Sequence, residues 1–473
     1  MSTLHNSVQS INKKEIRLTP SRFNKWRNYI FILCWAGIFI CLSYAYAEKP
    51  QQMPNFIVFV ADDLGAVDLN CYGATDLRTP HIDNLAKNGI RFTQFYAPSP
   101  VCTPSRGAFL TGRYPDMNGA LVNAQSFHAD EITIAEMLKP AGYTSGLIGK
   151  WHLGMQNGGP NGEGFDYFFG HRGGCIENWK HDTLDWDTGK VLHPDLWRNM
   201  DAVHLDGEHF GDLMVKETIG FLQRNKDKPF FAYVAFNNPH YPVQPLKHHF
   251  DAYAHMKEPR RSYAAFVSTM DEQIGRIMQE VDSLGLRNNT VVIFMSDQGH
   301  SNEKRNMLFV KDADPKHPGG GSAGIYKGEK FQCHEGGVRV PFIISWQGHL
   351  SVGEARNQMA SSVDLLPTIA ELTGASLPEK PLDGKSLAEI LHDKNAPATH
   401  NILRYMTTGP NHWAIRKDKW KLVMLGNLYL YDMDNDVEEK VNLAEQYPEI
   451  VKELTELHTR LRSGGAYGYH AKE

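Results

Sequence analysis

Residues 55–63 read NFIVFVADD, a continuous apolar run that stops at two carboxylates, Asp62 and Asp63. An apolar run of this length without polar alternation is typical of a strand buried on both faces, as in a parallel sheet. In open α/β sheets, ligands bind beyond the carboxyl ends of the strands. The stretch therefore predicts an α/β fold whose functional site begins at Asp62.

Other stretches of the chain repeat this design. Apolar runs predict strands at 143–148, 229–236, 290–295 and 340–346, and the spacing of apolar residues predicts helices at 79–86 and 261–285. Three of the runs lead directly into polar clusters, at 149–152, 237–240 and 296–300. Strands that alternate with helices favour a sheet covered by helices on both faces.

The chain changes character near residue 401. Short alternating runs at 413–416 and 420–423 predict a small antiparallel sheet, followed by a terminal helix at 448–462. We therefore expect a small α+β subdomain after the α/β domain.

The first 47 residues resemble an export signal rather than part of the fold. A basic segment precedes residues 29–47, which carry no charge and end in the A-x-A pattern Ala45-Tyr46-Ala47. We predict a cleaved signal peptide; the run is also just long enough for an uncleaved membrane anchor. In both cases the protein body is periplasmic or secreted, and it meets a membrane only through this segment.

The predicted organisation has three parts: a signal peptide at 1–47, a catalytic α/β domain at 50–400 and a C-terminal subdomain at 401–473. The formal net charge is −5 and the sequence pI about 6.5. This balance gives no reason to expect nucleic acid as a partner, and binding of a polyanion would require a local basic site.

Carboxylates at two predicted strand ends indicate a metal site. Asp62 and Asp63 follow one strand, and Asp297 and Gln298 follow another. Adjacent carboxylates repel each other unless a cation lies between them. Oxygen ligands without His or Cys favour Ca²⁺, with Mg²⁺ second, over zinc. Taken alone, a strand-end Asp pair is also compatible with helix capping or simple solvation.

Cys102 lies in the run CTPSR at 102–106. A cysteine-phosphatase loop requires Arg six positions after Cys, where this chain has Ala108. A thiol-protease interpretation needs a paired His and is unspecific. A lone Cys is most often an inert buried residue, so the residue type by itself does not identify a nucleophile.

The neighbourhood of Cys102 resembles the signature of the formylglycine-dependent sulfatases, C-x-P-S-R followed by T-G-R, here CTPSR at 102–106 and LTGR at 110–113. Further family motifs follow in the family's order over nearly the whole mature chain: DD at 62–63, GKWH at 149–152, NPH at 238–240, SD at 296–297 and Lys330 ahead of EGG at 335–337. The resemblance implies an alkaline-phosphatase-like α/β fold, with a large mixed or parallel central sheet flanked by helices and a smaller C-terminal antiparallel sheet.

The resemblance also implies a cofactor made from the chain itself. Cys102 would be oxidised to formylglycine by a separate formylglycine-generating maturation enzyme. One hydroxyl of the hydrated aldehyde would attack sulfur, and the other would then lose its proton to expel sulfate. Asp62, Asp63, Asp297 and Gln298 would bind one Ca²⁺ together with formylglycine at 102.

The remaining site residues take their roles from the same resemblance. Arg106 would hold the hydrated aldehyde near the metal, and Lys150 and Lys330 would bind sulfate oxygens. His152 would accept the proton of the second hydroxyl, and His240 would donate a proton to the leaving oxygen.

Four points stay open at this stage. Lys327 lies close enough in sequence to replace Lys330 as the sulfate contact. Family members commonly have Asn or His where this chain has Gln298, which puts metal affinity in doubt. A phosphomonoesterase or phosphonate monoesterase of the same superfamily is an alternative, although a two-zinc phosphatase would need His ligands there. A non-enzymatic glycan-binding relative is a further alternative.

The sequence favours an O-sulfated carbohydrate as the substrate, with a small aryl sulfate as the alternative. Residues 170–197 are rich in His, Asp and Trp, a composition that suits sugar rings or, equally, a surface insertion packed by its own tryptophans. We expect Arg172, His181 and His300 to bind substrate. Glu303 and Arg305 follow the predicted metal strand and are expected to border the pocket.

Overall fold

The computed structural model describes residues 53–185, 190–307, 318–407, 409 and 411–462, which cluster as one unit. The predicted signal peptide at 1–47 lies outside the described residues. Among the described residues, no helix is both long enough and apolar enough to cross a membrane.

A mixed sheet forms the centre of the fold, and in the described residues it contains ten strands in the order β13-β2-β12-β11-β1-β10-β4-β5-β8-β9. Its middle is parallel: β1 pairs with β10 and β11, and β10 pairs with β4. The strands are β1 (Asn55–Asp62), β2 (Ile90–Phe92), β4 (Thr144–Lys150), β5 (Tyr167–His171), β8 (Trp197–Arg198), β9 (Asp201–Ala202), β10 (Phe230–Pro239), β11 (Thr290–Ser296), β12 (Phe342–Ser345) and β13 (Glu354–Arg356).

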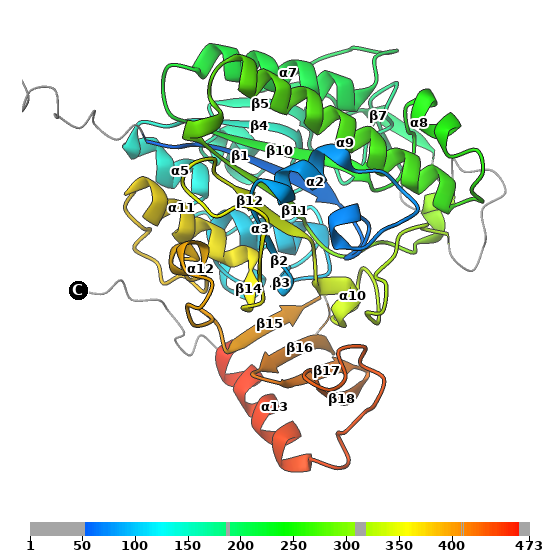
Figure 1. Ribbon diagram of the computed structural model, residues 1–473, viewed down its shortest axis with the longest axis vertical. Coiled ribbons are helices and arrows are strands. Elements are labelled where there is room, and N and C mark those ends of the chain that lie inside the picture. Colours follow the sequence, from blue (N-terminus) through cyan, green and yellow to red (C-terminus); the bar gives the residue numbers. More distant parts are fainter. Residues whose placement is uncertain (1–52, 186–189, 308–317, 408, 410, 463–473) are drawn as a thin grey trace, which may run out of the picture. The chain divides into compact units, whose positions relative to one another are not determined.

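Helices cover both faces of this sheet (Figure 1). Phe56, Val58 and Val60 of β1 join one buried cluster, whereas Ile57 and Phe59 join the other. One face packs on α2 (Pro80–Lys87), α7 (Phe210–Asn225) and α9 (Arg260–Ser283); the opposite face packs on α3 (Cys102–Thr111), α5 (Ile134–Leu138) and α11 (Leu365–Thr373). Burial on both faces explains why β1 is apolar throughout instead of alternating.

A separate antiparallel sheet follows near the C-terminus. It consists of β15 (Ile402–Met406), β16 (His412–Lys417), β17 (Trp420–Leu425) and β18 (Asn427–Asp432), paired in chain order. One face buries Ile415 and Leu422 against Leu454 and Leu457 of α13 (Pro448–Arg462). The predicted fold class, a large mixed sheet flanked by helices plus a smaller antiparallel sheet, is confirmed.

The remaining elements are short. The helices are α4 (Pro115–Asn118), α6 (Gly159–Gly162), α8 (Lys247–Ala252), α10 (Glu335–Val338) and α12 (Ala388–His392). The small strand pairs are β3 (Phe95–Tyr96) with β14 (Ala360–Ser361) and β6 (Asp182–Leu184) with β7 (Val191–Pro194). The 3-10 turns are η1 (Asn70–Tyr72), η2 (Lys139–Ala141), η3 (Gln156–Gly158), η4 (Arg287–Asn289), η5 (Lys304–Met307) and η6 (Ser362–Asp364).

Candidate active site

Four parallel strand ends meet at one edge of the central sheet. The strands β11, β1, β10 and β4 are neighbours, so the polar residues that follow them converge. Asp63 and His152, just past β1 and β4, adopt left-handed backbone with φ of 62° and 56°. Such conformations are uncommon outside glycine and are concentrated at functional sites. The fold thus places the predicted polar clusters in one location.

Cys102 is the first residue of α3 and is 1% exposed. Its Sγ lies 3.1 Å from Gln298 Nε2 and 3.7 Å from Asp62 Oδ1. Burial raises the pKa of the Cys102 thiol to about 12. The unmodified thiol is therefore protonated near neutral pH and is a poor nucleophile.

Arg106 lies one helical turn after Cys102, on the same face of α3. Its Nη2 is 2.7 Å from Asp297 Oδ2 and 3.5 Å from Asp62 Oδ1, and its Nη1 contacts the Tyr233 hydroxyl at 3.3 Å. Burial would lower the pKa of Arg106, but Asp297 and the other nearby acidic groups raise it well above its ordinary value. The guanidinium thus joins the ends of β1 and β11 below the thiol.

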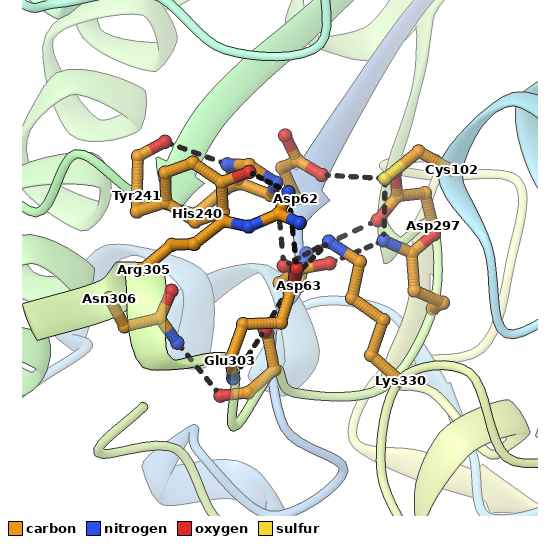
Figure 2. A network of polar contacts seen from close by, with 12 residues as sticks. Asp62, Asp63, Cys102, His240, Tyr241, Asp297, Glu303, Arg305, Asn306 and Lys330 are labelled. Atoms are coloured by element: carbon orange, nitrogen blue, oxygen red, sulfur yellow. Dashed lines mark hydrogen bonds and ion pairs between the residues drawn. The ribbon is translucent and has the colours of Figure 1, made fainter. Parts of the chain in front are cut away.

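Two lysines complete the charged cluster. Lys150 Nζ lies 2.6 Å from Asp62 Oδ2. Lys330 Nζ lies 2.9 Å from Asp63 Oδ2 (Figure 2). Burial favours the neutral form of Asp62, but the positive charge of Lys150 holds its pKa far below the usual range. The pKa of Asp63 is raised to about 7, because burial outweighs the attraction of Lys330.

The structure distinguishes Lys330 from Lys327. Lys330 Nζ reaches the carboxylates of Asp63 and, at 3.1 Å, Glu303. Lys327 Nζ instead contacts the Tyr431 hydroxyl at 3.0 Å, in the C-terminal sheet. Of the two candidates, Lys330 belongs to the polar cluster at the strand ends.

Both predicted proton-transfer histidines lie at the cluster. His240 Nδ1 is 2.7 Å from the Tyr241 carbonyl, so Nδ1–H donates to it and Nε2 points toward Asp63 Oδ2, 3.7 Å away. The backbone carbonyl of His152 accepts a hydrogen bond from the Thr103 hydroxyl of α3. Burial, reinforced by nearby lysines, lowers the pKa of both imidazoles well below its ordinary value.

A buried group of side-chain donors could hold a metal ion. Side-chain donors of Asp62, Asp63, Cys102 and His240 all lie within 4.8 Å of one another. The buried Gln298 Oε1 has no hydrogen-bond partner among the described residues, while Nε2 of the same amide faces Asp63 Oδ1. Turning this amide over would present its oxygen to the same place. The carboxylate and amide oxygens match the ligands of Ca²⁺.

Asp297 has a different setting from the other predicted metal ligands. Arg106 binds its Oδ2, and its Oδ1 accepts the backbone N–H of Asp63 at 3.2 Å. It lies outside the four-residue donor group, so its role as a ligand stays a prediction. Burial raises the pKa of Asp297 to about 6, opposed by Arg106.

Two of the three predicted substrate-binding residues, Arg172 and His181, make their contacts outside this cluster, whereas His300 contacts Lys330. The Arg172 guanidinium stacks on Trp197, 3.6 Å from the ring centroid. His181 is buried and its Nε2 lies 3.0 Å from the Glu208 carbonyl. His300 accepts the backbone N–H of Lys330 through its own carbonyl. Their contact with substrate therefore stays a prediction.

Glu303 and Arg305 do border the cluster, as expected. Glu303 pairs with Lys330, and Arg305 Nη1 lies 3.4 Å from the Tyr241 hydroxyl (Figure 2). Sequence reasoning missed the tyrosines: Tyr233, which contacts Arg106, and Tyr241. Tyr233 lies within the apolar run of β10 and looks like a core residue, so only its hydroxyl distinguishes it.

The fold is alkaline-phosphatase-like, with a large mixed sheet flanked by helices and a smaller antiparallel sheet. The fold is similar to that of the phosphonate monoester hydrolase of Agrobacterium radiobacter, with a TM-score of 0.62, 19% identity and coverage of 87% of this chain and 96% of that chain.

Within this class, the chain belongs to the sulfatase family and is a sulfuric ester hydrolase: the family profile Sulfatase matches residues 54–375. The profile "N-sulphoglucosamine sulphohydrolase, C-terminal" matches residues 322–464.

Named relatives agree with this assignment. The chain is 32% identical to N-acetylgalactosamine-6-O-sulfatase of Bacteroides thetaiotaomicron, over 86% of this chain and 93% of the relative. It is 33% identical to human arylsulfatase A, over 74% and 70% of the respective chains. The crystal structure of Ps i-CgsB in complex with k-i-k-neocarrahexaose is similar with a TM-score of 0.77 and 27% identity, covering 89% of this chain and 95% of that chain.

Proposed function

We propose that the protein removes sulfate from an O-sulfated carbohydrate with a formylglycine made from Cys102 and one bound Ca²⁺. The observation that carries this proposal is the position of Cys102. It begins α3 directly above Arg106 and faces the carboxylate of Asp62 and the amide of Gln298. Because the buried thiol itself is protonated, the position gains a nucleophile by conversion rather than by ionisation.

The two cofactors would supply a hydroxyl nucleophile, from the hydrated aldehyde, and a divalent charge that activates it. Asp62, Asp63, Asp297 and Gln298 would hold the cation. Arg106 would orient the group at position 102, since its guanidinium is fixed by Asp297 on one side and Tyr233 on the other.

Charge balance favours an anionic ester in this site. Four carboxylates, those of Asp62, Asp63, Asp297 and Glu303, face the three cations Arg106, Lys150 and Lys330. A divalent cation would leave a net positive, buried site that attracts a sulfate ester. The amines of Lys150 and Lys330 would bind the sulfate oxygens and stabilise them as charge shifts during transfer.

The histidines would move protons. His240 has Nδ1 occupied by the Tyr241 carbonyl, which directs Nε2 into the cluster. With an anionic sulfate ester bound beside it, the ring would take up a second proton on Nε2 and pass that proton to the departing alcohol oxygen. His152 would accept the proton of the second hydroxyl at position 102 and so promote release of sulfate.

Relatives support carbohydrate as the substrate class. One is named N-acetylgalactosamine-6-O-sulfatase, and a similar structure was solved in complex with a neocarrahexaose. A small aryl sulfate is the second candidate, because relatives at 33% identity are named arylsulfatase. The phosphonate monoesterase shares the fold at 19% identity, which carries no argument about activity.

The decisive experiment combines mass spectrometry with a substrate panel. After co-expression with a maturation enzyme, the peptide that contains residue 102 should carry formylglycine. The protein should then release sulfate from sulfated sugars and aryl sulfates much faster than phosphate from matched aryl phosphates. A peptide that retains only thiol while sulfate is released would overturn the formylglycine assignment. Preference for phosphate would overturn the sulfatase specificity.

We also propose export through residues 1–47, with a catalytic domain at 50–400 and a subdomain at 401–473. Export would carry the mature protein out of the cytoplasm through this segment. Amino-terminal sequencing of the exported protein distinguishes a cleaved signal, starting at Glu48, from an uncleaved anchor.

A further inference from the structure

The segment 327–337, which carries Lys330, is held at its first residue by the C-terminal sheet. Lys327 Nζ donates to the Tyr431 hydroxyl at 3.0 Å and to the backbone carbonyl of Glu439 at 3.2 Å. Tyr431 is in β18, and Glu439 follows this strand. The start of the segment is therefore attached to a part of the fold that contains none of the proposed catalytic residues.

The same glutamate also holds the other end of the segment. The backbone N–H of Glu335 donates to Glu439 Oε2 at 2.8 Å. Lys421 Nζ of β17 lies 2.8 Å from Glu335 Oε1 and 2.9 Å from Glu439 Oε1, and all three side chains are 0% exposed. Glu439 thus contacts both ends of the segment, through its carbonyl at one end and its carboxylate at the other.

Short backbone contacts connect these ends to the charged cluster. Gly336 N–H donates to the Lys327 carbonyl at 2.7 Å and closes the segment into a loop. Lys330 N–H donates to the His300 carbonyl at 2.9 Å, and Gly299 N–H donates to the Gly337 carbonyl at 3.0 Å. A shift at Glu439 would therefore move the loop that fixes the Lys330 amine beside Asp63.

The burial of this charge group points to a positional purpose. A buried ion pair contributes little net stability, because desolvation offsets the attraction, but it holds its partners in one arrangement. The sheet already has an apolar core against α13. We propose that Glu439 and Lys421 are positioning residues that set the place of the Lys330 amine and thereby the affinity of the site for sulfate. This inference rests on the proposed sulfate-binding role of Lys330.

The test uses a charge-balanced double variant of the matured enzyme, Lys421→Met with Glu439→Gln, which removes one positive and one negative group. The readouts are the inhibition constant of inorganic sulfate and the KM and kcat for an aryl sulfate. We expect sulfate to bind about tenfold more weakly, which corresponds to partial loss of one charge-assisted hydrogen bond. Lys419→Met is the matched control, because its pair with Asp432 lies in the same sheet at the surface; it should leave all three constants unchanged.

A double-mutant cycle with Lys330→Ala separates positioning from general destabilisation. If Glu439 and Lys421 act through Lys330, the change should add no further loss of sulfate affinity once Lys330 is alanine. If the loss of sulfate affinity from the Lys421/Glu439 change multiplied the loss from Lys330→Ala, the inference would be overturned. Unchanged sulfate binding in Lys330→Ala alone would instead remove the role of Lys330 itself, while leaving the formylglycine test unaffected.

A gentler variant covers the case in which the double variant does not fold. Tyr431→Phe deletes only the hydroxyl that receives Lys327. We expect about a twofold loss of sulfate affinity, since one hydrogen bond at the edge of the network is removed. A folded Tyr431→Phe protein with wild-type sulfate affinity would contradict the inference.

Discussion

The carboxyl ends of β1, β4, β10 and β11 and the small sheet β15–β18 both bury charge, but they do so differently. At the strand ends, Gln298 Oε1 and His240 Nε2 are buried without a hydrogen-bond partner among the described residues. Beside the small sheet, Lys421 lies between two carboxylates. Open atoms alone do not separate the two regions, because the Tyr405 hydroxyl beside the small sheet is also buried without a hydrogen-bond partner among the described residues. At the strand ends, however, the open atoms lie among donors that could hold a metal ion, which suits a ligand site. Buried charges that pair with one another, as around Lys421, fix the positions of the segments that carry them.

The largest effect is expected from replacing Cys102, the residue proposed to become the nucleophile at the strand ends. Cys102→Ala should reduce turnover of an aryl sulfate by about 10⁴-fold or more, as nucleophile deletions do. The fold should persist, because alanine at the start of α3 disturbs little packing. Turnover and a thermal melt measure both effects. Cys175→Ala, which removes another buried free thiol, is the control and should keep its activity. Retained activity in Cys102→Ala would refute the assignment.

The second prediction concerns proton donation by His240. His240→Ala should slow a substrate with a poor leaving group, such as a sulfated sugar, by about 10²-fold or more. A nitrophenyl sulfate should lose far less, because its leaving group needs no proton. The ratio of kcat/KM losses for the two substrates is the measurement. Equal losses would remove the general-acid role of this imidazole.

A smaller effect is expected from the open amide at the strand ends. Gln298→Ala removes one proposed oxygen ligand and should raise the Ca²⁺ concentration needed for half-maximal activity by about tenfold. Stabilisation of the chelator-treated protein by added Ca²⁺, followed by thermal melting, gives a readout that does not depend on turnover. Identical Ca²⁺ titrations for the variant and the wild type would show that Gln298 is not a ligand.

The smallest effect concerns the stability of the small sheet β15–β18. Lys419→Met removes an exposed amine that pairs with the buried carboxylate of Asp432, and pairs near the surface contribute about 0–1 kcal/mol. The free energy of unfolding, measured with denaturant, should change by less than about 1 kcal/mol. A large loss of stability would mean that the exposed amine of Lys419 contributes as much to the free energy of unfolding as the buried charges around Lys421.

The sequence predicted the middle of the central sheet well, because the pattern that marks these strands lies within each strand itself. The strands predicted at 55–60 and 290–295 appear as β1 and β11, and the terminal helix at 448–462 appears as α13. Strands buried on both faces need uninterrupted apolar runs, which are visible without knowledge of the neighbours. Very short strands such as β8, next to the edge strand β9, were not predicted, because two residues carry no pattern.

The candidate site was predictable as a set of residues but not as a set of contacts. The choice between Lys327 and Lys330 depends on which amine reaches Asp63, a partner more than two hundred positions away in the chain. Glu303 likewise gains its importance only from its contact with Lys330. Motifs predict which chemistry is present, whereas the pairing of buried charges is decided by tertiary packing.

The contacts of Glu439 have a consequence for how the protein becomes active during synthesis. The first carboxylate of the site is residue 62 and the residue that contacts both ends of the Lys330 segment is 439, so the two are separated by most of the polypeptide. Contacts between segments this far apart form late, after the intervening chain has been made. A nascent or prematurely terminated chain that ends before the small sheet would therefore carry every proposed catalytic residue and still lack the contacts that hold Lys330. Such a shortened chain should therefore bind sulfate more weakly than the full-length protein, even with every proposed catalytic residue present.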